Sequence, residues 1–382
     1  RVNAPHVPFL PRWRDLQSTA FDLARNSTAR RTVTIDLWGK PAEVYANANL
    51  SIYSAQTCNA RCAFCVEELR PAARGVSLAT QKVVERDDTR YFTALRDVLN
   101  ALKPLNPSMS VTGGEPSQDA RLPRILRTLQ AAYAQGARKR TVTTNGSGLL
   151  DQRDGRRVID WIADTGVAHL NISRAHWDDR VNARLMRYRS DASPDAAALR
   201  EIVACAKLGG TRVRLSCVLV ARAVDDLDDV VRYLDFAASV GVDNVIFRQL
   251  MRHDPAVTRA NFVTRFSERR GVVMTPLLTA LQQRSDFSFV RQVMGYYYYV
   301  EVWRYGEPGC AGGRRAPRTP PRGRAGGLPH RGAGCRTPRR ARRFPEARGP
   351  APGHRQGGNG GGRRGQRGAT LRRADRPPCR RE

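Results

Sequence analysis

The sequence predicts an α/β fold: a partial (β/α)6 barrel of the TIM type, with an N-terminal extension and a disordered C-terminal tail rich in Arg, Gly and Pro. Two observations support this prediction. Short runs with strand character alternate with longer runs whose apolar residues fall on one helical face. At four joints a helical run ends at a glycine and a strand starts within a few residues, which is typical of parallel strands with right-handed crossovers. Six such units are too few for a closed eight-stranded barrel.

Each unit pairs one predicted strand with one helical segment. The strands lie at 51–53, 108–111, 141–143, 168–172, 213–220 and 244–250. The helical faces are clearest at 91–102 and 122–129, and the glycine joints are at Gly136, Gly166, Gly210 and Gly241. The carboxyl ends of parallel strands meet at one edge of a barrel, so we expect the chemistry there.

Four segments divide the chain. Residues 1–47 are an N-terminal extension, 48–252 the core barrel, 253–308 a C-terminal cover segment and 309–382 the tail. Only the second segment carries the repeated β/α pattern, so it is the part in which we expect a functional site.

The flanking segments also carry local patterns. The extension is predicted to hold a helix near 15–25 and a β-hairpin within 32–45. The cover segment is predicted to hold a helix near 276–283 and an aromatic strand at 295–303. Core or edge packing is favoured for that strand over a base-stacking surface.

The formal charge of +30 is concentrated in the last 74 residues, where 21 Arg face three acidic residues. Arg, Gly and Pro supply 48 of these residues, so no core can form there. Two explanations fit: an Arg/Gly-rich arm that binds RNA, or a reading frame that has slipped near Gly306. We favour the slip, because the tail lacks Lys, Ile, Val, Met, Tyr and Trp. The rest of the chain has a mixed, solvated surface, and nucleic acid is a less favoured partner.

No apolar run approaches the length needed to span a membrane, and no signal peptide is present. We therefore expect no membrane partner and a cytoplasmic location. In that compartment thiols stay reduced, so cysteines are available as metal ligands.

Cys58, Cys62 and Cys65 are spaced C-x3-C-x2-C directly after the first predicted strand. An odd number of thiols does not indicate a disulfide framework, whereas three soft sulfur ligands on one loop suit an iron–sulfur cluster. Three ligands leave one iron of a four-iron cluster open. A zinc knuckle or three incidental buried cysteines are the structural alternatives.

A second motif, Thr-Gly-Gly-Glu-Pro at 112–116, follows the second predicted strand. The paired glycines Gly113 and Gly114 let a ligand lie against the backbone, and Glu115 can accept hydrogen bonds from an ammonium group. An ordinary turn with a solvated acid is the alternative interpretation.

Together, the cysteine loop and this second motif resemble the hallmarks of the radical S-adenosylmethionine (radical SAM) superfamily, with a core like that of the molybdopterin cyclases. The resemblance covers residues from about 50 to 252. It implies a radical SAM enzyme in which the thiolates of Cys58, Cys62 and Cys65 hold a [4Fe–4S] cluster. In the family, S-adenosyl-L-methionine (SAM) binds the fourth iron, and its reductive cleavage yields a 5′-deoxyadenosyl radical that abstracts hydrogen from the substrate.

The resemblance also implies contacts to SAM. Phe64 matches the aromatic position that packs by the adenine, and Gly114 and Glu115 match the groups that hold the methionine ammonium. A polar cluster at 143–146 resembles one that lines the substrate cavity of related enzymes.

Three later strand ends carry further matches. Ser173 resembles a ribose or carboxylate contact, Arg214 a cationic contact and Met251 a methionine near the adenine. Arg248 and Gln249 lie on the last strand of the same set. A plain structural role is an equal alternative for these residues, because polar groups at strand ends need hydrogen-bond partners in any barrel.

The resemblance implies an unidentified substrate and an electron donor such as flavodoxin or ferredoxin, and it assigns no catalytic side chain. Members with a second cluster place extra cysteines after the barrel, but residues 252–308 contain none. This argues against the pterin-forming cyclases and the twin-cluster maturases. The alternatives are an RNA-modifying radical SAM enzyme and a truncated or nucleic-acid-binding product without catalysis.

Overall fold

A computed structural model describes residues 32–46, 48–54, 57–69, 85–133, 139–189, 193–251, 253, 255, 258–294, 299–306 and 368–373. The chain divides into two compact units, Arg1–Pro308 with Gly365–Glu382, and Gly309–Arg364. Every described residue belongs to the first unit. The predicted boundaries at 47, 252 and 308 stay predictions.

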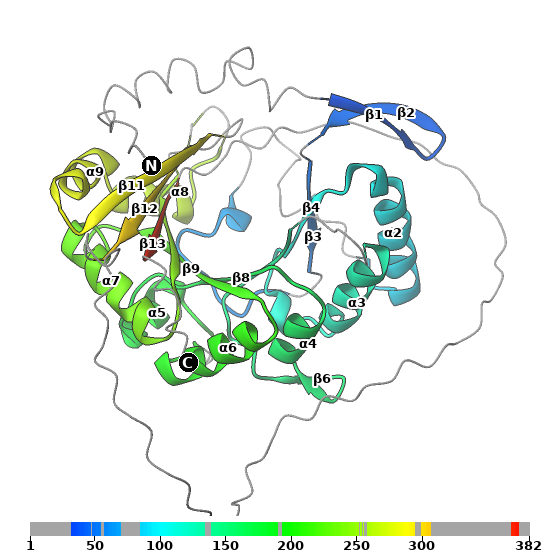
Figure 1. Ribbon diagram of the computed structural model, residues 1–382, viewed down its shortest axis with the longest axis horizontal. Coiled ribbons are helices and arrows are strands. Elements are labelled where there is room, and N and C mark those ends of the chain that lie inside the picture. The colour runs from blue at the N-terminus through cyan, green and yellow to red at the C-terminus, as the bar shows by residue number, and fades with distance from the viewer. Residues whose placement is uncertain are drawn as a thin grey trace, which may run out of the picture. The chain divides into compact units, whose positions relative to one another are not determined.

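Six parallel strands form the centre of the fold and follow one another in chain order (Figure 1). They are β3 (Asn49–Tyr53), β4 (Ser108–Thr112), β5 (Arg140–Thr144), β8 (His169–Ser173), β9 (Arg212–Leu219) and β10 (Asn244–Gln249). The predicted α/β fold with six β/α units is confirmed, and the strands lie within two residues of their predicted bounds.

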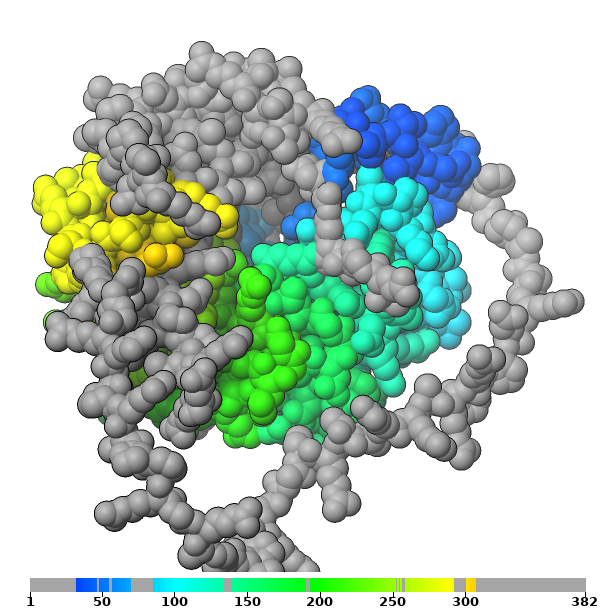
Figure 2. Space-filling model, viewed as in Figure 1, coloured from blue at the N-terminus to red at the C-terminus, as the bar shows by residue number. Residues whose placement is uncertain are grey.

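Helices cover the outer face of the curved sheet (Figure 1). They are α2 (Asp88–Ala101), α3 (Leu122–Ala132), α4 (Val158–Asp164), α6 (Ala196–Leu208) and α7 (Leu227–Ser239). In the space-filling view these helices make a continuous surface from cyan to green (Figure 2). Aspartates cap several of them: the side chains of Asp87, Asp195 and Asp226 accept hydrogen bonds from backbone N–H groups in the first turn.

Glycines after three of the helices adopt the left-handed conformation that the sequence predicts. Gly166, Gly210 and Gly241 have φ angles of 70°, 77° and 83°. A residue with a Cβ is disfavoured at such angles, so glycine lets the chain leave the helix and enter the next strand within a few residues. Gly136, the fourth predicted joint, lies outside the described residues.

The strands bury one face and keep the other half-buried. On β9, Val213, Leu215, Cys217 and Leu219 are buried in the core against the helices, while the residues between them are half-buried. β4 and β8 show the same alternation. The buried set is apolar and faces the helices, so the intervening residues face the inside of the barrel.

The predicted N-terminal hairpin is confirmed. β1 (Thr32–Leu37) pairs antiparallel with β2 (Lys40–Tyr45). Trp38 and Gly39 connect them with positive φ angles of 56° and 80°, the conformation that a two-residue hairpin turn requires. The predicted helix near 15–25 lies outside the described residues.

The C-terminal segment adds α8 (Phe262–Arg270), α9 (Met274–Gln283) and the antiparallel pair β11 (Phe287–Met294) and β12 (Tyr299–Tyr305). The predicted helix near 276–283 is confirmed, as is the aromatic strand over its described part. Trp303 is buried and packs edge-on against Phe289, so this part of the aromatic run serves the core. Residues 295–298 lie outside the described residues.

One part of the tail differs from the prediction of disorder. Residues Gly368–Arg373 form β13, which lies between β10 and β12 in the sheet. Composition alone predicted no structure here, but the open edge of β10 provides backbone groups that any short extended segment can pair with. The rest of the tail lies outside the described residues. Among the described residues no helix is long and apolar enough to cross a membrane.

Candidate functional site

The three cysteines of the C-x3-C-x2-C motif lie on the loop that follows β3. Cys58, Cys62 and Cys65 are half-buried free thiols. Backbone hydrogen bonds connect this loop to the segment that follows α5 (Asp179–Met186). Arg61 N donates to Arg187 O at 3.1 Å, and Arg189 N donates to Asn59 O at 3.0 Å.

Polar groups surround the sulfur atoms. Ala60 N lies 3.4 Å from Cys58 Sγ, and Asn145 Nδ2 lies 3.7 Å from the same sulfur. Cys62 Sγ lies 3.6 Å from Met186 Sδ. Hydrogen bonds to a ligating sulfur tune the potential of a cluster, so donors in these positions fit a metal-binding loop.

Burial raises the pKa of the Cys58 thiol and the pKa of the Cys62 thiol. For Cys62 the neighbouring sulfurs of Cys65 and Cys58 raise it further. Three adjacent thiolates therefore need a positively charged partner, and a bound iron cluster supplies one while displacing the protons. The donor set fits a cluster ligated by three thiolates.

The glycine pair after β4 lies directly beside the first strand. Gly113 and Gly114 have φ angles of 80° and 55°. A Cβ on Gly113 would lie 2.1 Å from Cδ1 of the Tyr53 ring, so a larger residue cannot be accommodated without moving that ring. The turn after β4 therefore requires glycine. Because glycine has no side chain, a ligand can approach the backbone closely at the end of this strand.

Glu115 is almost fully buried, and its carboxylate is engaged by the protein itself. It accepts hydrogen bonds from Ser117 N at 2.9 Å, Ser117 Oγ at 2.7 Å, Asn145 N at 2.6 Å and the Thr144 hydroxyl. Burial raises the pKa of Glu115, while these hydrogen bonds favour the ionised form. The carboxylate thus joins the ends of β4 and β5. A contact from Glu115 to an ammonium group stays a prediction.

The predicted polar cluster at 143–146 contacts the cysteine loop through Asn145. Asn145 Nδ2 donates to Asn59 Oδ1 at 2.8 Å, within the C-x3-C segment. The Tyr188 hydroxyl donates to Asn145 O at 3.0 Å, which ties the same strand end to the segment after α5. The ends of β3, β4 and β5 therefore form one connected polar network.

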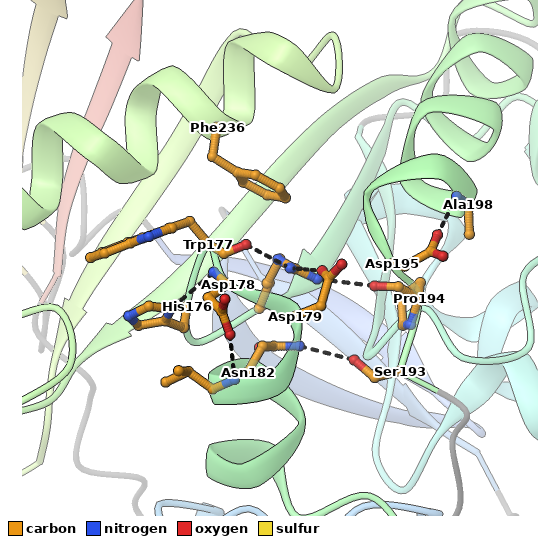
Figure 3. A network of polar contacts seen from close by, with 12 residues as sticks. His176, Trp177, Asp178, Asp179, Asn182, Ser193, Pro194, Asp195, Ala198 and Phe236 are labelled. Atoms are coloured by element: carbon orange, nitrogen blue, oxygen red, sulfur yellow. Dashed lines mark hydrogen bonds and ion pairs between the residues drawn. The ribbon is translucent and has the colours of Figure 1, made fainter.

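The loop between β8 and α5 is held by a buried arginine that the sequence prediction did not single out. Arg174 donates to Pro194 O at 3.0 Å, to Trp177 O at 2.9 Å and to the Asp179 carboxylate, and its guanidinium lies 4.7 Å from the Phe236 ring centroid. Figure 3 shows these partners gathered around one point. We call this set the Arg174 network. It fixes α5, whose C-terminal end holds the cysteine loop.

Phe64 packs against a small apolar cluster that is separate from the main core. The cluster is formed by Val220, Ala223 and Leu250, with Val218 and Phe266 beside it. Met251, two residues after β10, is half-buried next to Leu250 in sequence. Residues just after β9 and β10 thus contact Phe64, which directly precedes Cys65. Met251 is not among the residues of this cluster.

Ser173 and Arg214 lie on the inner side of β8 and β9. Ser173 pairs in register with Ser216, and Arg214 pairs with Asn171, one step deeper in the barrel. Arg248 on β10 donates from Nε to Ser216 Oγ at 3.1 Å. Ser216 thus links β8 and β10, and in strand order β5 separates β8 from β4, the strand that precedes Glu115.

A cavity of about 230 Å³ opens at the cysteine loop and is lined by Arg61, Arg187 and Phe262. The exposed side chains of Arg61 and Arg187 make the lining of this cavity cationic.

A comparison with models of protein families identifies the family of this chain. The radical SAM superfamily matches residues 52–247, about half of the chain and nearly the whole set of parallel strands. This chain belongs to the radical SAM superfamily, whose enzymes use a [4Fe–4S] cluster and SAM.

Curated relatives are more distant. A GTP 3′,8-cyclase of Parasynechococcus marenigrum is 28% identical over 232 residues, which are 56% of this chain and 61% of the relative. A GTP 3′,8-cyclase of Tolumonas auensis is 27% identical over 178 residues, which are 46% of each chain. This chain therefore spans less than two thirds of the length of either relative.

Solved structures with a similar chain path include coproporphyrinogen III oxidase (HemN) from Escherichia coli, with a TM-score of 0.41 and 14% identity over 62% of this chain and 50% of that chain. Another is SuiB of Streptococcus suis, with a TM-score of 0.37 and 18% identity over 64% of this chain and 44% of that chain.

The sequence prediction missed the residues whose hydrogen bonds position the segments of the site. Ser117, Tyr188 and Arg174 are single polar residues without a motif, and each acquires its role from partners far away in sequence. For Ser117 and Arg174 the one available signal was their position just after the ends of β4 and β8, where polar side chains gather in a barrel. Tyr188 follows α5 and carried no such signal.

Proposed function

We propose that this chain is a radical SAM enzyme in which Cys58, Cys62 and Cys65 hold the [4Fe–4S] cluster. The observation that supports this most strongly is the fixation of all three thiols on one loop at the carboxyl ends of the strands. The cysteine loop is anchored both to the polar cluster after β5 and to the segment after α5.

In this proposal the open iron is left to SAM. Once bound, cluster and SAM together supply a one-electron cleavage that leaves a carbon-centred radical to abstract hydrogen from the substrate. The protein's own residues bind and orient. Gly113 and Gly114 let the methionine end approach the backbone, and Glu115 fixes their strand end. Phe64 offers an apolar surface for the adenine, Met251 after β10 offers a second one, and Ser173 offers a hydroxyl for ribose or carboxylate.

Two side-chain roles follow from the surroundings of the sulfurs. Asn145 and the Ala60 N–H direct positive dipole toward Cys58, which stabilises its thiolate form. Met186 beside Cys62 provides an apolar contact that excludes water from that sulfur. An electron donor such as flavodoxin or ferredoxin is part of the proposal, because the cleavage consumes one electron.

Reconstitution under anaerobic conditions tests the proposal. With iron and sulfide, the wild-type chain should take up about four irons and convert SAM to 5′-deoxyadenosine once reduced. Cys62→Ala should lose both properties. Cys205→Ala is the matched control, because Cys205 is a half-buried free thiol on α6 and should leave them unchanged. A Cys62→Ala chain that keeps the cluster and the cleavage would overturn the assignment.

The names of the curated relatives make GTP the first substrate to assay with the reconstituted enzyme. The described residues of the C-terminal segment, 258–294 and 299–306, contain no cysteine that could add a second thiolate set. Substrate-dependent acceleration of 5′-deoxyadenosine formation, compared with ATP as the control nucleotide, decides whether GTP is accepted.

A further inference from the structure

The cysteine loop forms a short two-stranded ribbon with the segment after α5. Backbone hydrogen bonds of 3.1 Å and 3.0 Å pair residues 59–61 of the loop with residues 187–189. At the centre of the pairing, Ala60 and Tyr188 form an antiparallel β-bridge. The ribbon therefore joins two segments that are far apart in the sequence.

The side chains of this ribbon divide between the interior and the surface. Ala60 is buried, and the Tyr188 hydroxyl donates into the polar network after β5. Side chains alternate along an extended backbone, so Arg61 and Arg189, which flank these two residues, point outward. Both are exposed, as is Arg187. Three guanidiniums therefore lie on the surface side of the cysteine loop.

The charge of these arginines is not neutralised by the protein. Among the residues that the structure describes, no ion pair joins the side chain of Arg61, Arg187 or Arg189 to a carboxylate. Elsewhere the chain does pair its arginines, since the three arginines at 153–157 each lie beside an aspartate. An exposed group of like charges raises the local concentration of an oppositely charged partner and steers its approach.

This charged surface lies next to the thiols. Arg61 directly precedes Cys62 in the chain. Burial raises the pKa of the Cys58 thiol, and the positive charge of Arg189 opposes that rise, so this guanidinium acts on the sulfur. The transfer of an electron between proteins slows steeply with distance. A protein that contacts Arg61 would lie beside the residues that hold the cluster in the proposed function.

An aromatic ring adds an apolar contact to the same surface. Phe262, the first residue of α8, lines the cavity together with Arg61 and Arg187. α8 is attached to the cysteine loop, because Asn261 Nδ2 donates to Glu68 O at 2.8 Å. Arginine and aromatic residues are enriched where proteins contact one another, whereas acidic residues are depleted. The lining of this cavity therefore has the composition of a protein contact.

We infer that Arg61, Arg187, Arg189 and Phe262 form the docking surface for an acidic protein that carries one electron. The inference rests on the proposed function, because a cluster on this loop is what requires an electron there. One electron leaves the flavin or iron–sulfur group of the reduced carrier, which is oxidised, and enters the cluster; no bond forms or breaks in this step. Contacts between redox partners are small and transient, and electrostatic complementarity sets their association rate.

The test compares two reductants on the reconstituted full-length chain. A reduced flavodoxin, which is an acidic protein, requires a docking surface, whereas reduced methyl viologen is a small cation that does not. In the double variant Arg61→Gln with Arg187→Gln, kcat/KM for the flavodoxin should fall about tenfold at low salt through a higher KM, because electrostatic steering is lost. Formation of 5′-deoxyadenosine with the viologen should stay at the wild-type rate.

Binding and salt dependence give two further measurements. Isothermal titration with oxidised flavodoxin should show weaker binding to the double variant than to the wild-type chain. Added salt should slow the wild-type reaction with flavodoxin more than that of the double variant, since salt screens the charges that the variant lacks. The tail is present in every variant, so the differences report on the docking surface.

Two matched variants serve as controls. Arg61→Lys with Arg187→Lys keeps both charges and should recover most of the kcat/KM. Arg212→Gln removes an exposed arginine at the amino end of β9 and should behave like the wild-type chain. The strands are parallel, so Arg212 lies at the opposite edge of the sheet from the loop that follows the carboxyl end of β3.

Three results would overturn the inference. The first is an unchanged kcat/KM for flavodoxin in the double variant. The second is an equal loss with both reductants, which would assign the arginines to the cofactor or the substrate. The third is weaker binding of a single-stranded RNA with unchanged reduction by flavodoxin, which would assign them to nucleic acid. Failure of the wild-type chain to cleave SAM with the viologen would instead refute the proposed function, whatever the titration shows.

Discussion

The first three β/α units and the last three build their side of the site differently. In the first half, the polar residues and cysteines of the candidate site lie on short continuous segments after β3, β4 and β5. Hydrogen bonds of Glu115 and Asn145 connect these segments. In the second half, the residues of the candidate site are spread singly over β8, β9 and β10. Under the proposed function, cofactor binding uses fixed loops, whereas the second half provides separate side chains.

The largest expected effect concerns the Glu115 carboxylate, which connects the ends of β4 and β5 in the first half. Glu115→Ala removes a buried acceptor and leaves the donors of Ser117, Thr144 and Asn145 without a partner, so the free energy of unfolding should fall by about 3 kcal/mol. Urea denaturation measures it. Asp97→Ala on the exposed side of α2 is the control and should cost less than about 0.5 kcal/mol. Equal losses for the two variants would show that the strand ends do not depend on this carboxylate.

A smaller effect is expected from the Arg174 network, which lies in the second half and fixes α5 next to the cysteine loop of the first. Arg174→Ala should lower the free energy of unfolding by about 2 kcal/mol, because a buried charge and its hydrogen bonds are lost while the partner Asp179 is half-exposed and remains solvated. It should also speed the release of iron to a chelator, since α5 holds the cysteine loop. Arg180→Ala, an exposed residue on α5, serves as the control.

The two measurements on Arg174→Ala separate two roles. Lower stability with an unchanged rate of iron release would mean that the Arg174 network supports the fold alone and does not position the cluster loop.

The smallest effect depends on pH. Burial lowers the pKa of His176, which stacks on Trp177 and accepts a hydrogen bond from Asp178 N. The unfolded chain therefore binds a proton that the folded chain resists, so stability is complete above about pH 6.5 and falls as the pH drops below it. His176→Asn should make this decline shallower by less than about 1 kcal/mol. Free energies of unfolding at pH 8 and pH 5.5 give the comparison, and an unchanged difference between the two pH values would exclude a contribution from His176.

The same contrast explains how much the sequence could predict. Glycine joints and alternating runs predicted all six strands, because each pattern is local and its physical cause acts within a few residues. The cysteine loop and the Gly-Gly-Glu motif were predictable for the same reason. Arg174 could not be recognised, since an isolated arginine in a basic chain indicates a solvated surface. Its burial depends on Pro194 and on Phe236, 62 residues away. The strand at Gly368–Arg373 escaped prediction because its pairing depends on the open edge of β10 and not on its own composition.

The central claim is that three cysteines hold a cluster with one iron open to SAM. Electron paramagnetic resonance of the reduced, reconstituted enzyme tests it most directly. Addition of SAM should shift the spectrum of the cluster, because SAM would then bind the open iron. A spectrum that stays the same at saturating SAM would contradict the account.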